Sequence, residues 1–212
     1  MRLPYAPSTP PPDAPPSVSD IYTRIAARRH PRPPIPLDLT LLHSPPVANG
    51  YNAFVGALRT ETIVPQSILV LAISRVAILT DAVYEWNIHA SLALKAGLDP
   101  NVLAAAKDTP KGGFGTAYEG SQRAERSQRA EALSDKHRAV LNYTDQVTLN
   151  VKVDDLVFEN LSKHFGHREV VELTTVVAGY NAVSRILVPL DVGENNDKKM
   201  KTVQELVDEL RG

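Results

Sequence analysis

The sequence predicts an all-α fold, a multi-helix bundle, from the spacing of its apolar residues and from the lack of strand patterns. From residue 46 onward, apolar residues recur at spacings of three and four, the period of a helix with one buried face. Strand-like alternation never exceeds four residues with turn-forming residues on both sides. At 212 residues, the chain is long enough for one domain with a sizeable core.

Proline divides the chain, because 13 of its 17 prolines lie in the first 46 residues. Residues 1–17 are expected to form a disordered or extended arm, and residues 31–46 an extended path. A short amphipathic helix is predicted between them, over 18–30. Residues 18–192 are expected to form the helical domain, and residues 193–212 a polar linker with an amphipathic C-terminal helix.

Helix start and stop residues set the remaining elements. Ser19 and Asp81 are predicted N-caps, Ser134 and Asp99-Pro100 are predicted to start helices, and Gly97 is a predicted C-terminal stop. The expected helices are 46–60, 65–80, 81–96, 100–107, 134–149, 153–165, 169–187 and 202–210. The Gly-rich segment 109–123 is predicted to be a surface loop. A lid carrying Phe114 and Tyr118 is the alternative.

Charge and composition exclude several classes of function. The formal net charge is −1, so the sequence lacks the basic surplus of proteins that bind nucleic acid or an anionic membrane. The chain has no cysteine, which excludes disulfides, thiolate nucleophiles and Cys-ligated metals. No HxxxH or HExxH pair occurs, so no metal site is predicted. The apolar run 68–83 carries charged residues and is predicted to be a core helix. We expect a cytoplasmic protein.

Glu85 and His89 are the strongest catalytic candidates. They are four residues apart on one predicted helix, so their side chains share a face. A carboxylate at that spacing can hold an imidazole in one tautomer and raise its basicity. Tyr84 and Trp86, the only tryptophan, flank Glu85. An ordinary surface pair of Glu85 with His89 is the structural alternative.

Arg75 stands in an otherwise apolar run, where an unpaired charge is costly. It therefore faces a ligand or has a structural partner, for which Glu172 and Asp191 are the candidates. Further along, Tyr180 and Arg185 interrupt an apolar helix and need partners or a ligand. The remaining polar candidates for the substrate site are Asn181, beside Tyr180, and His43.

The segment YEWNIH, with the apolar helix before it and AGL behind it, resembles the carboxymuconolactone decarboxylase family of the AhpD-like superfamily. The resemblance covers roughly residues 22–192. Thiol peroxidases of this superfamily have a CxxC followed by a histidine. Here Ala82 and Glu85 occupy the two cysteine positions, while His89 is retained. The family's relay glutamate is replaced by Val70, which indicates a diverged member with another substrate, and a role in natural-product biosynthesis is expected.

The resemblance implies an AhpD-like helical protomer that assembles as a homo-oligomer, a trimer or hexamer, around small-molecule sites. It also implies cofactor-independent chemistry. The expected function is a carbon–carbon lyase, a decarboxylase, acting on a carboxylated lactone or β-keto acid through an enolate. His89 is the expected general acid/base, oriented by Glu85. Arg75 or Arg185 would bind the carboxylate or enolate.

The other expected substrate contacts are hydrogen bonds and an aromatic wall. Tyr180 and Asn181 would donate or accept hydrogen bonds, Tyr84 and Trp86 would form the wall, and His43 would line the pocket. Two alternatives stay open. One is an isomerase, dehydratase or cyclase that acts on a polyketide-like intermediate. The other is a ligand-binding family member without catalysis.

Overall fold

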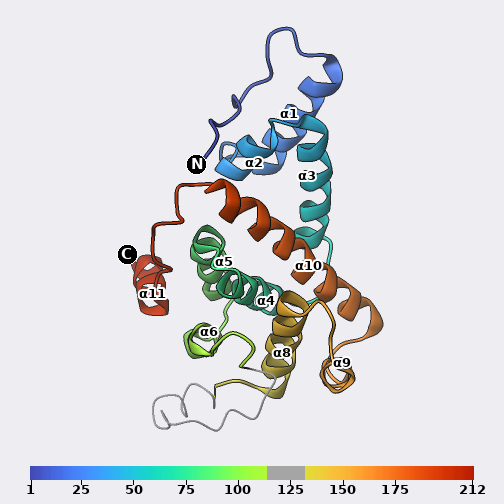
Figure 1. The fold of residues 1–212 in the computed structure, drawn as a ribbon, viewed down its shortest axis with the longest axis vertical. Helices are drawn as coiled ribbons and strands as arrows, with labels where there is room; N and C mark the ends of the chain where they lie inside the picture. Colours follow the sequence, from blue (N-terminus) through green and yellow to red (C-terminus); the bar gives the residue numbers. More distant parts are fainter. Residues whose placement is uncertain (114–131) are drawn as a thin grey trace.

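The computed structural model describes residues 1–113 and 132–212, and within them it contains ten α-helices and no strand (Figure 1). The predicted all-α class is confirmed. Phe114 and Tyr118, the expected lid residues, lie outside the described residues. The helices are α1 (Pro16–Arg29), α2 (Pro36–Leu41), α3 (Pro45–Thr60), α4 (Gln66–Leu79), α5 (Val83–Lys95), α6 (Pro100–Asp108), α8 (Asp135–Leu149), α9 (Asp155–Ser162), α10 (His167–Leu190) and α11 (Val203–Arg211).

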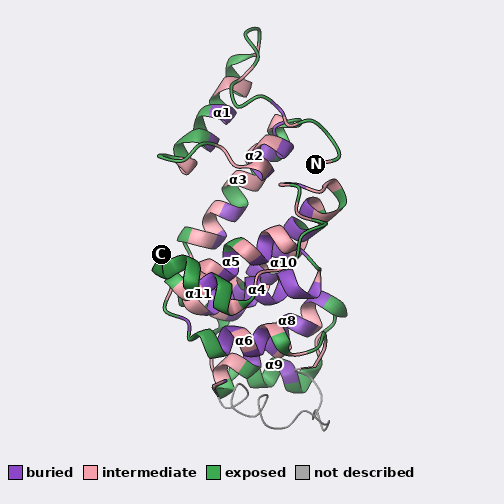
Figure 2. Ribbon diagram, turned by 90° about the vertical axis from the view of Figure 1, so that its left-hand side faces the viewer, coloured by how far each residue is buried: buried purple, intermediate pink, exposed green. Residues whose placement is uncertain are grey.

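Helix α4 is the buried centre of the bundle. Every residue from Ile68 to Leu79 is buried, as expected for a helix that is apolar on all sides. Helices α5, α8 and α10 pack around it, and Figure 2 shows the buried residues concentrated where these helices meet. One side of α4 joins a core shared with α1, α3, α8 and α10, and the other joins a core shared with α5, α6 and α11.

Several predicted helix ends are confirmed by their hydrogen bonds and backbone angles. The Ser134 side chain accepts from the amide of His137 at 3.2 Å, and that of Asp99 accepts from the amide of Asn101 at 2.7 Å. Gly97 has the left-handed φ of 82° that favours glycine after a helix. Asp81 differs from the prediction. It adopts φ 54° in the turn between α4 and α5, and Ala82 is the N-cap.

The proline-rich region is more helical than predicted. Helix α1 begins at Pro16, inside the expected arm, so Ser19 lies within the helix and is not its N-cap. Helix α2 lies within the expected extended path 31–46. Pro36 is the first residue of α2, where the missing amide proton costs no helical bond. The Asp38 carboxylate accepts from the amide of Ile35 at 3.0 Å and completes this helix start. Proline therefore opens helices here rather than excluding them.

Two C-terminal helices have other bounds than predicted. Helix α9 covers Asp155–Ser162, which is shorter than the expected 153–165. Helix α10 starts at His167 and continues through Pro189 to Leu190. A proline in the last turn removes one intrahelical hydrogen bond and does not end the helix before it.

The first residues of the chain pack against the end of α10. The amide of Arg2 donates to the Leu190 carbonyl at 2.9 Å, and the amino group of Met1 lies 3.0 Å from the Glu194 carboxylate. The Tyr5 hydroxyl donates to the same carboxylate at 2.9 Å. These contacts give the beginning of the arm a fixed, extended path.

Helix α10 is, among the described residues, the one helix long and apolar enough to cross a membrane. It packs against α4, α8 and α3 within the bundle. A core helix of a globular domain passes the same test of length and composition, and we assign α10 to the core.

Candidate active site

The turn between α4 and α5 positions Glu85 and His89 in the interior. Asp81 takes the left-handed conformation that aspartate tolerates, so α5 folds back along α4. The side chains of Glu85 and His89, one turn apart, then lie on the buried side of α5. Glu85 is 1% exposed and His89 is 6% exposed. The alternative of a surface pair is therefore excluded.

Burial favours the protonated form of Glu85. Desolvation raises the pKa of this carboxyl well above its ordinary value, and the hydroxyl of Ser184 opposes the rise. Ser184 Oγ lies 3.0 Å from Glu85 Oε2 and 2.9 Å from the Tyr180 carbonyl oxygen. The serine has one proton for two acceptors. The hydroxyl can therefore donate to only one of these oxygens at a time, and the proton of a protonated Glu85 can occupy Oε1.

His89 is neutral for the same physical reason. Burial, with the nearby Arg59 guanidinium, lowers its pKa to about 3. The imidazole meets the Tyr180 ring edge-on, with centroids 4.8 Å apart and an angle of 81° between the planes. Among the described residues, the buried atoms His89 Nδ1 and Glu85 Oε1 have no hydrogen-bond partner. The structure therefore lacks the expected hydrogen bond by which Glu85 would orient His89.

Helix α3 contributes residues that the sequence did not single out. The Arg59 guanidinium helps to lower the pKa of His89 and opposes the rise in the pKa of Tyr180, so it lies near both side chains. Tyr51 lies close to Tyr180. Burial raises the pKa of Tyr51 and Tyr180, so both phenols stay neutral donors. Asn52 and Arg59 are seven residues apart, a spacing that places them on one helix face. These two polar residues on one face of a largely apolar helix were the sequence signal that could have pointed to α3.

Arg75 is committed to a structural role. Its Nε and Nη2 donate to the Asp145 carboxylate at 2.6 and 2.7 Å. Its other donors reach backbone carbonyls of Ala106 and Thr109, both at 2.8 Å, and of Pro110 at 2.9 Å. All five guanidinium protons are thus used. The partner is Asp145, rather than the expected Glu172 or Asp191, and the structure does not bring Arg75 to the Glu85–His89 cluster.

The two aromatic residues beside Glu85 also lie apart from the cluster. Trp86 is fully buried in the core shared with α6 and α11, and its Nε1 donates to the Lys201 carbonyl at 2.9 Å. Tyr84 packs on Gly193, where an added Cβ would lie 2.6 Å from the ring. Residues adjacent in a helix point about 100° apart, so neither flanking ring forms the wall expected beside Glu85.

The remaining expected substrate contacts already have partners in the described residues. Asn181 Nδ2 donates to Thr148 Oγ1 at 3.0 Å, and Asn181 Oδ1 accepts from Arg185 at 2.6 Å. The exposed His43 lies at the end of α2, where its Nε2 is 2.6 Å from the Pro4 carbonyl oxygen and ties the arm to α2. Of the expected contacts, the structure brings Tyr180 to His89 and places the others elsewhere.

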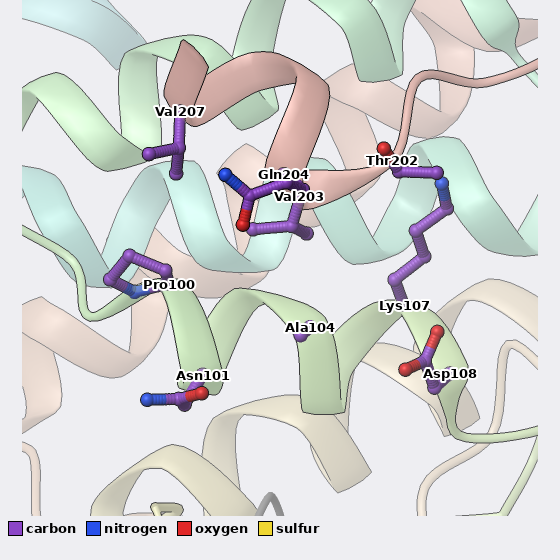
Figure 3. Close-up of a pocket in the computed structure, with 9 residues that line it drawn as sticks. All are labelled: Pro100, Asn101, Ala104, Lys107, Asp108, Thr202, Val203, Gln204 and Val207. Atoms are coloured by element: carbon purple, nitrogen blue, oxygen red, sulfur yellow. The ribbon is translucent and has the colours of Figure 1, made fainter. Parts of the chain in front are cut away.

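A separate pocket of about 290 Å³ lies between α6 and α11 (Figure 3). Its one lysine, Lys107, is engaged, because Nζ donates to the carbonyls of Met200 and Lys201. None of its lining residues belongs to the Glu85–His89 cluster. Among the described residues, no group of three or more acidic or histidine side chains is arranged to hold a metal ion.

No protein-family model and no curated protein sequence matches the chain. Solved structures do match it. The debrominase Bmp8 in complex with 2,3,4-tribromopyrrole has a TM-score of 0.61 and 13% identity, over 92% of this chain and 91% of that chain. The alkylhydroperoxidase AhpD core of an uncharacterized peroxidase-related protein from Ralstonia eutropha has a TM-score of 0.61 and 16% identity, over 90% of both chains.

An uncharacterized peroxidase-related protein from a Silicibacter species has a TM-score of 0.62 and 14% identity, over 92% of this chain and 95% of that chain. The chain has an AhpD-like fold. The resemblance drawn from YEWNIH is confirmed at this level. This AhpD-like chain has no cysteine, so a CxxC thiol mechanism is not open to it, and a glutamate and a histidine line the site instead.

Proposed function

We propose that the chain is an enzyme that moves protons on a small carboxylated molecule, a carbon–carbon lyase acting on a carboxylated lactone or β-keto acid through an enolate. The observation that supports this is the pair of unpartnered buried atoms, Glu85 Oε1 and His89 Nδ1, on one face of α5. Buried polar atoms without partners are rare and costly in folded proteins. Glu85 and His89 are therefore available to a ligand.

The proposed reaction uses the protonation states that burial imposes. Cleavage of the bond to the carboxylate releases CO2 and leaves the electron pair as an enolate. Tyr180 and Arg59 stabilise the enolate oxygen, the atom where negative charge develops. The protonated Glu85 delivers its proton to the carbon, and His89 returns a proton from solvent to Glu85. Glu85 is thus the proton donor in this scheme and His89 the relay. From the sequence, His89 was expected to be the general acid/base and Glu85 the residue that orients it.

Product mass tests the proposal. The wild type and the variants Glu85→Gln and His89→Gln are incubated with a panel of carboxylated lactones and β-keto acids. A loss of mass equal to CO2 that requires both residues is the expected result. An unchanged mass with a new structure, or a loss of water, would point to an isomerase, cyclase or dehydratase. Equal CO2 release by all three proteins would refute the assignment.

Assembly as a trimer or hexamer stays a second proposal. Large apolar side chains are exposed on neighbouring helices of one protomer, and a second copy could cover them. They include Val47, Phe54, Leu156, Phe158 and Val171. Light scattering coupled to size-exclusion chromatography measures the mass directly. A monomeric mass at micromolar concentration would contradict the proposal.

A further inference from the structure

Three arginines from α1 and α3 gather beside the Glu85–His89 cluster. The charges of Arg29 and Arg59 help to lower the pKa of the Arg28 guanidinium, and Arg28 and Arg59 both oppose the rise in the pKa of the Tyr180 hydroxyl. The helix crossing explains the approach. Helix α3 passes so close to α10 that a Cβ on Gly179 would lie 2.7 Å from Leu58 Cδ1. The end of α3, with Arg59, therefore lies next to Tyr180.

Among the described residues, Asp38 is the carboxylate that pairs with these arginines, and Arg29 forms hydrogen bonds with both of its oxygens, at 2.6 and 2.8 Å. Asp38 Oδ2 also accepts from the amide of Ile35. Arg28 Nη2 remains 3.8 Å from Asp38 Oδ1, beyond hydrogen-bond distance. Arg28 Nε and Nη2 are buried, and neither has a hydrogen-bond partner among the described residues.

The facing side of α3 presents Arg59, which forms a hydrogen bond with the Tyr180 hydroxyl, and Asn52. No described carboxylate lies within ion-pair distance of Arg59, and Asn52 Oδ1 is buried without a hydrogen-bond partner. Gly56 lies between Asn52 and Arg59 on this face, and a Cβ there would be 3.9 Å from Arg28 Cδ. That distance is ordinary van der Waals contact, so Arg28 packs on this face of α3. Burying charged donors without hydrogen bonds, as at Arg28 Nε and Nη2, costs stability, and a bound anion would supply the missing acceptors.

We propose that Arg28 and Arg59 form a carboxylate-binding subsite that holds the substrate with its reacting carbon against Glu85 and His89. This inference rests on the proposed function. Two guanidinium groups suit a carboxylate because their planar N–H pairs match its two oxygens. Glu85, His89, Tyr51 and Tyr180 are all neutral, so the subsite keeps its positive charge. The subsite selects for a substrate that carries a carboxylate in addition to the group that becomes the enolate.

Binding of a matched acid and ester tests the subsite. The probe is 5-oxotetrahydrofuran-2-carboxylate, a carboxylated lactone, and its neutral methyl ester is the comparison. Titration calorimetry at fixed ionic strength measures both ligands. The wild type is expected to bind the acid and not the ester, and Arg28→Gln or Arg59→Gln to weaken acid binding about tenfold or more, as loss of a charged hydrogen bond does. Arg24→Gln is the control, since Arg24 is exposed on the same helix.

Several outcomes would overturn the subsite. These are equal binding of acid and ester, acid binding by Arg28→Gln and Arg59→Gln that equals the wild type, and a wild type that binds neither ligand. Tighter binding of inorganic phosphate than of the acid would also overturn the choice of a carboxylate. Without ligand, Arg28→Gln should melt at or above the wild-type temperature, because it removes buried donors that lack hydrogen bonds. A clearly lower melting temperature would make Arg28 structural.

His89→Gln separates this inference from the proposed function. The variant should lose turnover and keep the wild-type affinity for the acid, because the imidazole lies outside the guanidinium pair. Affinity that depends on Arg28 and Arg59, in a protein that turns over no panel member, would remove the lyase and leave the subsite standing. Turnover that is unchanged in both arginine variants would remove the subsite and leave the lyase standing.

Discussion

Ser184 on α10 lies 3.0 Å from Glu85 on α5, and this contact holds one carboxyl oxygen while the other has no partner among residues 1–113 and 132–212. The contact joins two helices that are distant in sequence. It fixes the carboxyl plane, so that Oε1 has a defined direction. A buried, positioned and protonated carboxyl group is the arrangement that general acid catalysis needs.

Glu85→Gln should abolish proton transfer and preserve the fold. The amide is uncharged, as the protonated carboxyl is, and it can keep the contact with Ser184. Turnover should fall about 10² to 10⁴-fold, the usual contribution of a general acid. Steady-state kinetics and thermal unfolding at neutral pH measure the two effects. A variant that retains wild-type turnover would exclude Glu85 as the proton donor.

His89 should make the protein less stable in acid. Its folded pKa of about 3 lies below the ordinary 6.5, so the unfolded state binds the extra proton in this window. The stability that the neutral His89 contributes above pH 6.5 is therefore lost as pH falls towards 3. The equilibrium constant for unfolding should rise by up to about tenfold per pH unit in this range. His89→Gln should remove this loss. Urea unfolding at several pH values checks it, and parallel pH curves for the two proteins would contradict it.

Glu85 should have the opposite effect on stability. Its folded pKa is raised above the ordinary 4.5, so the native state holds the proton longer than the unfolded chain. The stabilisation that the protonated Glu85 contributes is complete below pH 4.5, and it is lost as pH rises through the folded pKa. Relative to the wild type, Glu85→Gln should therefore gain stability as pH rises above 4.5. The same urea series measures this, and a gain that appears only below pH 4.5 would show that the sign is wrong.

Arg75→Met should be strongly destabilising. The substitution leaves the Asp145 carboxylate buried without its cation, which costs about 3 to 5 kcal/mol. Arg168→Met is the matched control, because Arg168 forms an exposed ion pair with Glu172 within α10 and should cost less than about 1 kcal/mol. Denaturant unfolding gives both values. Similar costs for the two variants would show that the Arg75 pair is not the buried anchor described above.

Leu206→Ala should loosen α11 from the bundle. Leu206 is fully buried, and its truncation should cost about 2 to 5 kcal/mol of local or global stability. Trp86, the only tryptophan, reports the change, because undocking of α11 frees its Nε1 from the Lys201 carbonyl and shifts its fluorescence to longer wavelength. Leu210→Ala, at an exposed position of the same helix, should leave the spectrum unchanged. A shift in both variants would contradict the packing.

Gly179→Ala and Gly50→Ala should change stability in opposite directions. A Cβ at Gly179 would meet Leu58 Cδ1 at 2.7 Å, and forcing it into the crossing of α3 and α10 should cost about 1 to 3 kcal/mol. Gly50 is exposed in α3 with nothing within 4 Å, so alanine there should stabilise the helix by about 0.5 to 1 kcal/mol. Thermal unfolding distinguishes the two, and equal shifts would contradict the close crossing.

Local features of this fold could be read from the sequence. The apolar run that became α4, the helix starts at Ser134 and Asp99, and the stop at Gly97 depend on neighbouring residues only. The shared face of Glu85 and His89 also follows from helical spacing. The proline-rich segment misled the prediction, because proline favours both an extended path and the first turn of a helix, and the tertiary packing of α2 selected the second.

What the sequence determined by itself was the helical class, the order of the helices and the pairing of Glu85 with His89 on one face. Tertiary structure decided everything that depends on distant partners. Arg75 meets Asp145, which is 70 positions away, and Arg59 reaches Tyr180 because α3 crosses α10. The protonation states of Glu85 and His89 also depend on tertiary structure, because the helices packed around α5 exclude the water that would stabilise their charged forms.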